Sequence, residues 1–297
     1  MKILVIGSSS FTGKNFCEYA RKQGAQVVDI SIRDGAINPD TSWKDANVVN
    51  FAAVNVVAPS WDNPTWYLHM NTDMLTWLAD DMRNWGVGKY VHISTPEVYG
   101  NTTGFVREDA PYNPSTPYAV SRAAAEMMLK CYHQQYGFPV VFTRSCNVYG
   151  PGQQLYRLIP KLIVSIKKGI KFPLEGGGQS SRAFLHVDDA CAAIWKVMTD
   201  GAPGQAYNVS RASTTSIHGL ASMVCEQMSV KLENVSEPVA ERPGKDSGYY
   251  LNDDKIRLLG WSDKINLRAG IQTVIDWVNA NWDTLKDQSL EYNIHRP

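Results

Sequence analysis

Short apolar runs alternate with longer amphipathic stretches through the first half of the chain. The predicted strands are residues 2–6, 26–30, 48–53, 89–93 and 140–143, and the predicted helices are residues 14–22, 71–85 and 121–136. Strands that are apolar on both faces are typical of a parallel sheet covered by helices. The alternation therefore predicts a doubly wound α/β fold, in which ligands bind beyond the carboxyl ends of the strands.

The regular alternation ends after Gly150, where prolines and a run of three glycines interrupt it. We predict a first domain over residues 1–150, to which residues 184–210 return with a further strand and helix. Residues 151–183 and 211–297 are predicted to form a smaller, mixed α/β lobe that faces a substrate.

Composition and charge narrow the classes of partner. The chain has 29 basic and 29 acidic side chains, so no overall field attracts it to nucleic acid or to an anionic membrane. Five dispersed cysteines without a C-x-x-C pair fit a reducing compartment, and the six histidines lack ligand spacing, so no metal site is predicted. No apolar run is long enough to span a bilayer. We expect a soluble cytoplasmic protein, with Trp61 and Trp66 in its core.

A glycine-bounded turn, GSSSFTG over residues 7–13, follows the first strand and opens a helix. Glycines there let the backbone approach a pyrophosphate that rests on the helix N-terminus. The usual pattern is G-x-x-G-x-x-G, and a serine replaces its middle glycine, so an ordinary strand-to-helix turn is the alternative. The turn predicts a dinucleotide-binding (Rossmann) domain. Its predicted contacts are Gly7, Ser10, Phe11, Thr12 and Gly13.

The end of the second strand normally carries an acid that binds the adenosine ribose. That place falls on Ser31, with Asp29 two residues before it and Arg33 two residues after it. A missing acid beside an arginine suits a 2′-phosphate and favours NADP, with Ser31 and Arg33 as contacts. Asp29 could instead serve NAD, so the sequence leaves NAD and NADP open.

Three further motifs lie at predicted strand ends and at a helix start. They read HISTPEVYG from residue 92, PYAVSR from residue 117 and NVYGP from residue 147. With the glycine turn, they resemble the extended short-chain dehydrogenase/reductases, and among these most closely the nucleotide-sugar 4,6-dehydratases of the dTDP-glucose type. The patterns of that family are S-T-D-E-V-Y-G, Y-x-x-S-K and N-N-Y-G-P.

The resemblance continues along most of the chain. It includes the alanine pair at residues 52–53, an L-I-P at residues 158–160 and an R-P-G-x-D from residue 242. Residues 182–189 match the family's R-D-F-x-x-V-x-D, except that Ala183 replaces its first aspartate. The resemblance implies cofactor contacts by Ala52, Ala53, Asn71, Ser94, Tyr118 and Arg122, and substrate contacts by Asn147, Arg182 and Arg242. It also implies a homodimer formed through helices near residues 72–85 and 121–136.

The residue types in these motifs suit oxidation of a sugar hydroxyl. Tyr118 can take the hydroxyl proton as a phenolate if a nearby cation lowers its pKa. The family uses a lysine four residues further on, and this chain has Arg122, which keeps the charge but has a larger fork. Thr95 would hydrogen-bond to the same sugar hydroxyl. The resemblance implies that Glu97 then removes the proton beside the new 4-ketone, so that water leaves and a 4-keto-6-deoxy sugar forms.

Pro96 departs from the dTDP-glucose pattern, which has an aspartate there as the acid for the leaving water. GDP-mannose 4,6-dehydratases also lack that aspartate and keep T-x-E, whereas 4-epimerases generally lack the glutamate. Because Glu97 is present, we predict an NAD(P)-dependent nucleotide-sugar 4,6-dehydratase. The alternatives are a nucleotide-sugar 4-epimerase or C4 oxidoreductase, and a non-catalytic NAD(P)-binding sensor or scaffold.

Overall fold

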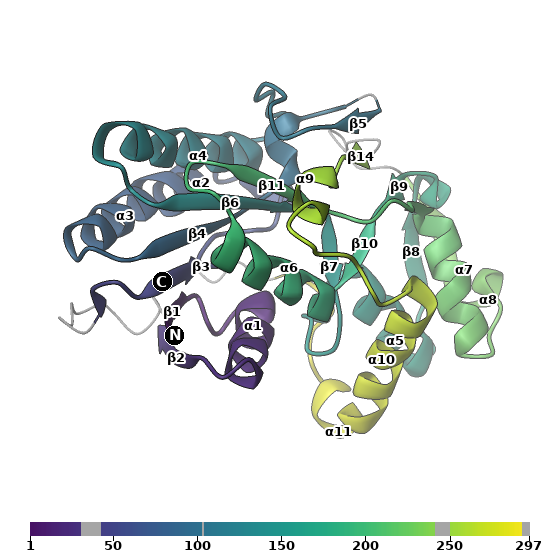
Figure 1. Ribbon diagram of the computed structural model, residues 1–297. Helices are drawn as coiled ribbons and strands as arrows, with labels where there is room; N and C mark the ends of the chain where they lie inside the picture. The colour runs from purple at the N-terminus through teal and green to yellow at the C-terminus, as the bar shows by residue number, and fades with distance from the viewer. Residues whose placement is uncertain (31–42, 103, 241–249, 293–297) are drawn as a thin grey trace.

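A six-stranded parallel sheet forms the centre of the computed structural model, which describes residues 1–30, 43–102, 104–240 and 250–292 (Figure 1). The strand order is β11-β6-β4-β3-β1-β2. The strands are β1 (Lys2–Ile6), β2 (Gln26–Ile30), β3 (Asn47–Asn50), β4 (Lys89–Ser94), β6 (Val140–Ser145) and β11 (Ala206–Val209). The chain leaves β1 toward β2 and then crosses back to β3, so the direction of winding reverses between β1 and β3. The predicted doubly wound fold is confirmed.

Helices cover both faces of this sheet. Helices α1 (Phe11–Lys22) and α6 (Val187–Asp200) pack together on one face, and α3 (Met74–Asn84) and α4 (Pro117–Tyr136) pack on the other (Figure 1). Alternate residues of β1 enter the two apolar cores: Ile3 and Val5 face α1, and Leu4 and Ile6 face α3 and α4. This alternation explains why the strand is apolar throughout.

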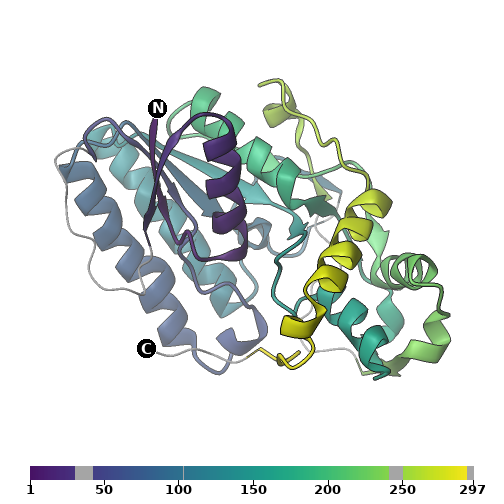
Figure 2. The ribbon, with the colours of Figure 1, turned by 90° about the horizontal axis from the view of Figure 1, so that it is seen from below.

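A second group of helices lies beside the sheet around its own apolar core (Figure 2). Its main helices are α5 (Leu158–Lys168), α7 (Ile217–Gln227) and α10 (Leu267–Ala280). Residues 184–210 reach the main sheet through α6 and through β11, which pairs with β6. The strand at the start of residues 184–210 is β10 (Phe184–His186), and it pairs with β7 (Asn147–Tyr149) outside the six-stranded sheet.

Short elements complete the described part of the chain. The remaining strands are β5 (Phe105–Val106), β8 (Phe172–Glu175), β9 (Ser181–Arg182), β12 (Thr215–Ser216), β13 (Ser236–Val239) and β14 (Tyr250–Leu251). The remaining α-helices are α2 (Pro64–Leu68), α8 (Leu232–Val235), α9 (Asp254–Arg257) and α11 (Trp282–Leu285). The 3-10 turns are η3 (Ala58–Ser60), η5 (Pro96–Tyr99) and η6 (Gly176–Gly178), and η4 (His69–Asp73) is a π-helical turn.

Trp61 and Trp66 were both expected in the core. The Trp61 side chain is instead 57% exposed, before α2 and beside a surface hollow of about 300 Å³, and Trp66 in α2 is half-buried. Among the described residues, no helix is both long and apolar enough to cross a membrane. The described residues also contain no group of three His, Cys, Asp or Glu side chains arranged to hold a metal ion.

Candidate active site

The glycine turn lies at the carboxyl end of β1, where the winding of the sheet reverses. Gly7 has φ +75°, and a Cβ at this position would lie 2.8 Å from the backbone nitrogen of Ala52. A Cβ on Gly13 would lie 2.4 Å from the carbonyl oxygen of Gly7. Both positions therefore require glycine, and the turn, the start of α1 and the loop after β3 approach closely.

Ser10, the residue that replaces the middle glycine, is the N-cap of α1. Its hydroxyl accepts a hydrogen bond from the backbone N–H of Gly13 at 3.1 Å. The N–H groups of Phe11 and Thr12 open the helix, where no intrahelical acceptor exists. These amides and the positive end of the helix dipole form a site suited to a phosphate group.

The predicted ribose contacts can be followed only in part, because Ser31 and Arg33 lie outside the described residues. Asp29 is described, and its carboxylate forms an ion pair with Arg21 of α1. Its side chain therefore lies toward the helix, and both partners are about half exposed. The predicted NADP contacts stay predictions.

The alanine pair lies in the loop after β3, and Asn71 holds this loop from behind. The Asn71 amide accepts from Val54 N–H at 2.8 Å and donates to Val54 C=O at 3.0 Å and to the Ser121 hydroxyl at 3.1 Å. Both amide hydrogens of Asn71 are thus used within the protein, and its side chain is fully buried. The structure places Asn71 as a support for the loop of Ala52 and Ala53.

Thr95, Glu97 and Tyr118 come together beyond the carboxyl end of β4. Thr95 is the N-cap of η5 and accepts from the backbone N–H of Glu97 at 3.3 Å. Its hydroxyl also hydrogen-bonds with Tyr118, which begins α4. Burial raises the pKa of Tyr118 and the Glu97 charge adds to this, while the charge of Arg122 and the Thr95 hydrogen bond oppose it. Tyr118 is therefore an acid–base group within reach of both a carboxylate and a cation.

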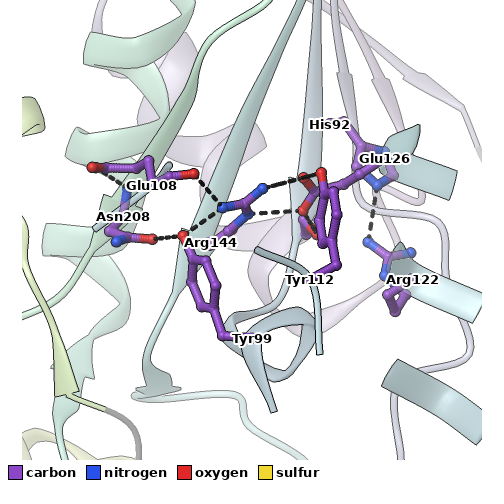
Figure 3. A network of polar contacts seen from close by, with 9 residues as sticks. His92, Tyr99, Glu108, Tyr112, Arg122, Glu126, Arg144 and Asn208 are labelled. Carbon is purple, nitrogen blue, oxygen red and sulfur yellow. Dashed lines mark hydrogen bonds and ion pairs between the residues drawn. The ribbon is translucent and has the colours of Figure 1, made fainter. Parts of the chain in front are cut away.

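Arg122 lies one helical turn after Tyr118 and is 2% exposed. Its Nη2 donates to the carbonyl oxygen of Ile93 and lies 3.3 Å from Nε2 of His92 (Figure 3). Burial and the neighbouring guanidinium lower the pKa of His92 to about 3, so this imidazole is neutral and can accept. Nε and Nη1 of Arg122 are buried without a hydrogen-bond partner in the part of the chain that the structure describes.

Ser94, a predicted cofactor contact, has a hydrogen-bond partner within the protein. Its hydroxyl donates to the carboxylate of Glu126. Glu126 is buried on α4 and paired with Arg144 of β6 (Figure 3). Sequence reasoning missed this pair. No sequence signal joins the two positions: Arg144 lies between Thr143 and Ser145 at the polar end of its strand, and Glu126 lies in the same long helix as Tyr118.

The predicted substrate residues lie at the edge of the second lobe. Asn147 is exposed at the start of β7, and Arg182 lines a hollow of about 170 Å³. The same hollow contains Arg211, which sequence reasoning missed and whose Nε lies 3.8 Å from the carboxylate of Asp263. Two arginines and the hydroxyls of residues 213–215 suit an anionic ligand. Arg242 lies outside the described residues.

Comparisons with known proteins extend this picture. The model of the NAD dependent epimerase/dehydratase family matches residues 3–210. The human dTDP-D-glucose 4,6-dehydratase is 34% identical over 249 residues, which are 81% of this chain and 70% of the relative. The dTDP-glucose 4,6-dehydratase of Streptomyces antibioticus is 34% identical over 244 residues, or 80% and 72% of the two chains. The crystal structure of DesIV, a dTDP-glucose 4,6-dehydratase of Streptomyces venezuelae with NAD bound, has 27% identity and a TM-score of 0.87 over 96% of this chain and 98% of that one.

Proposed function

Because the chain belongs to the NAD dependent epimerase/dehydratase family, we propose that it is a 4,6-dehydratase that removes water from a nucleotide-linked sugar. The family resemblance predicted from the motifs is confirmed. Its dehydratase relatives support the predicted activity over the 4-epimerase alternative.

The observation that carries this proposal is the position of Glu97. Its carboxylate is close enough to Tyr118 to raise the pKa of the phenol, and the Thr95 hydroxyl hydrogen-bonds with both the backbone N–H of Glu97 and the Tyr118 side chain. An enzyme that only oxidises and re-reduces one carbon needs a base such as Tyr118 but has no use for a second proton acceptor beside it. An elimination needs both.

The residues around the turn fit a nicotinamide dinucleotide. The close approach at Gly7 and Gly13 provides the backbone cradle for a pyrophosphate, and the two unpartnered donor atoms of Arg122 suit ribose hydroxyls. When bound, the nicotinamide would supply the hydride acceptor for the first step and the hydride donor for the last. We propose NAD as the dinucleotide, since DesIV holds NAD, and identification of the nucleotide released on denaturation distinguishes it from NADP.

Tyr118 and Glu97 would carry out the proton transfers. Tyr118 takes the proton of the sugar O4 while Thr95 holds the same hydroxyl. Glu97 then takes the proton from C5, the C6–O bond breaks, and Glu97 passes its proton to the departing hydroxyl, because Pro96 has no proton to give. A hydride then returns to C6, and C5 takes up a proton equivalent to the one that Tyr118 removed from O4, which leaves Tyr118 as a phenolate again. The sum is the loss of one water with no net oxidation of the sugar.

Substrate binding is proposed for the second lobe. Arg182 and Arg211 would hold the diphosphate, with Asn147 at the sugar, and Arg242 remains a prediction. The division into a dinucleotide-binding domain and a substrate lobe is likewise proposed. It is supported by the separate apolar core of α5, α7 and α10.

A cytoplasmic location remains a prediction from composition.

A homodimer is proposed through α3 and α4. Large apolar side chains project to solvent from these helices: Met74, Trp77, Val120, Met127 and Met128. Exposed apolar patches of this kind mark association surfaces. Light scattering should give twice the chain mass, and Trp77→Glu should reduce it to one chain. A wild-type protein with the mass of one chain would contradict the dimer.

Mass spectrometry of a nucleotide-sugar panel tests the activity. We expect one substrate to lose the mass of one water, and Tyr118→Phe to abolish this loss, because the phenol carries the first proton transfer. Tyr132→Phe, on the same helix but four turns away, is the matched control and should retain activity.

Other outcomes identify the alternatives. A product of unchanged mass and altered sugar configuration would establish an epimerase. Retained dinucleotide with no turnover of any sugar, in wild type and Tyr118→Phe alike, would establish a sensor or scaffold.

A further inference from the structure

The segment that carries Thr95 and Glu97 is held at both ends by one buried ion pair, Glu126 with Arg144. Figure 3 shows this pair and the Tyr99 end of the segment. At one end, the Ser94 hydroxyl donates to Oε1 of Glu126. At the other end, the Tyr99 hydroxyl accepts from Nη1 of Arg144. Glu126 and Arg144 are joined at 2.6 Å, and their side chains are 0% and 1% exposed.

Arg144 uses all of its hydrogen-bond donors in this arrangement. Nε and Nη2 donate to the two carboxylate oxygens of Glu126 at 3.0 and 2.6 Å. The second hydrogen of Nη2 goes to the Tyr112 hydroxyl at 3.3 Å, and Nη1 reaches the Tyr99 hydroxyl and the carbonyl oxygen of Glu108. Since a guanidinium has five N–H groups, none is left unpaired, and its orientation is fixed.

We propose that Glu126 and Arg144 are positioning residues for the dehydration, which fix Thr95 and Glu97 against Tyr118 by holding Ser94 and Tyr99. This inference rests on the proposed function. Neither residue needs to touch substrate or cofactor, because each acts through the segment between Ser94 and Tyr99.

Stability alone is a weak reason for such a pair, because well-packed apolar side chains often replace a buried ion pair without loss of stability. Placement of reacting groups is a stronger reason, since a shift of about 1 Å can slow catalysis by roughly 100-fold. The segment is short: Thr95 caps η5, and η5 has four residues. Tyr99 also donates to the Asn208 side chain at 2.9 Å, so its hydroxyl ties η5 to β11 as well as to β6.

The two ends depend on the pair to different degrees. Ser94 belongs to β4 and is already held by the sheet, where it is registered beside Arg144. Tyr99 lies beyond the sheet and two residues from Glu97, so its contact with Arg144 bears mainly on the carboxylate. Loss of that contact should impair proton removal by Glu97 more than the first step at Tyr118.

Two tyrosine variants test this inference with matched chemistry. The Tyr99 and Tyr112 hydroxyls each accept one hydrogen bond from Arg144 and donate one, to Asn208 and Glu126 respectively. Only Tyr99 belongs to the catalytic segment. Tyr99→Phe should lower kcat for water loss roughly 10-fold or more with KM within about 2-fold, while Tyr112→Phe should stay within about 2-fold of wild type.

The step that slows is measured in the same samples. With Tyr99→Phe, reduced nicotinamide should accumulate during one turnover, and exchange of the sugar C5 proton with deuterated water should slow, while the initial oxidation keeps its rate. Thermal unfolding of both variants checks that each is folded. Arg144→Lys, which keeps the charge but cannot make five hydrogen bonds, should repeat the Tyr99→Phe pattern.

The outcomes separate the two proposals. Equal kcat in Tyr99→Phe, Tyr112→Phe and wild type, or an equal loss in both variants without accumulation of reduced nicotinamide, would overturn the positioning role and leave the dehydratase proposal intact. A wild-type protein that removes water from no nucleotide sugar would overturn both.

Discussion

At the scale of single residues, Arg122 shows how a departure from a family pattern is accommodated. The guanidinium lies beside β4. Its Nη2 donates to the carbonyl oxygen of Ile93 and lies 3.3 Å from Nε2 of the neutral His92 imidazole. Nε and Nη1 remain for a ligand, so the arginine keeps the charge beside Tyr118 and still offers donors. The substitution therefore alters the geometry of this cation without removing it.

Replacing that charge should move the pH profile. Arg122→Met removes a cation that lowers the pKa of Tyr118, so the pKa should rise. Because Tyr118 must be deprotonated to act as a base, the rising limb of kcat/KM should shift to higher pH, by roughly one unit or more. Arg122→Lys keeps the charge and should shift the limb less. An unchanged limb in Arg122→Met would show that Arg122 does not act on Tyr118.

Arg211 provides a second test at this scale. If Arg182 and Arg211 share the diphosphate, Arg211→Ala should raise KM for the nucleotide sugar about 10-fold or more, because a hydrogen bond to a charged group contributes roughly 1.5–3 kcal/mol. kcat should change little. Arg268→Ala, at an exposed ion pair on α10, is the control and should leave KM unchanged. An unchanged KM in Arg211→Ala would exclude it from the diphosphate site.

At the scale of elements, helix caps decide where the functional residues lie. Ser10 and Thr116 each accept a hydrogen bond from the N–H three residues on, so α1 and α4 begin at Phe11 and Pro117. Apolar periodicity predicts later starts, at residues 14 and 121, because it does not register the capping hydrogen bonds. The caps place the amides of the glycine turn and Tyr118 at the carboxyl edge of the sheet.

Substitution of Ser10 tests how much its capping hydrogen bond stabilises α1. Ser10→Ala removes the cap and should lower the free energy of unfolding by ~1 kcal/mol, whereas Ser10→Gly should cost only a few tenths. Thermal or urea unfolding measures this difference. Equal stability of the two variants would show that the Gly13 contact does not stabilise α1.

Local patterns were sufficient for the elements but not for the polar network. The strands at 2–6 and 26–30 were predicted at their observed bounds, because each depends on neighbouring residues. The motif from residue 92 ends β4 as predicted, whereas Asn147–Tyr149, predicted to end the strand at 140–143, forms the separate strand β7. Of the helix predicted over 71–85, residues 71–73 belong instead to the π-helical turn η4, and α3 begins at Met74. Asn71 contacts Val54 and Ser121 from this turn. Glu126, Arg144 and Arg211 depend on contacts between distant segments, for which a single sequence carries no signal.

At the scale of the whole molecule, two buried groups make stability sensitive to acid. Burial and Arg122 hold the pKa of His92 near 3, below its ordinary 6.5. Burial alone would raise the pKa of Glu126, but Arg144 and its hydrogen bonds lower it to about 2, below its ordinary 4.5. In both cases the unfolded chain binds the proton more readily than the native chain, so stability falls as pH falls.

The two groups should act in different pH ranges. His92 should weaken the native state as pH drops from about 6.5 toward about 3, and Glu126 from about 4.5 toward about 2. Urea unfolding at stepped pH should show a flatter profile above pH 4.5 for His92→Gln and below it for Glu126→Gln. Profiles parallel to wild type in both variants would contradict this assignment.

All five N–H groups of Arg144 are hydrogen-bonded, and this constrains how the chain can evolve. No other side chain offers five donors in a planar fork, so any single substitution at position 144 leaves a carboxylate, two phenols or a carbonyl without its partner. A substitution at position 144 becomes tolerable only after compensating substitutions on α4, on η5 and at Tyr112. Each of those compensating substitutions is itself harmful while Arg144 is present. We expect position 144 to be held by epistasis.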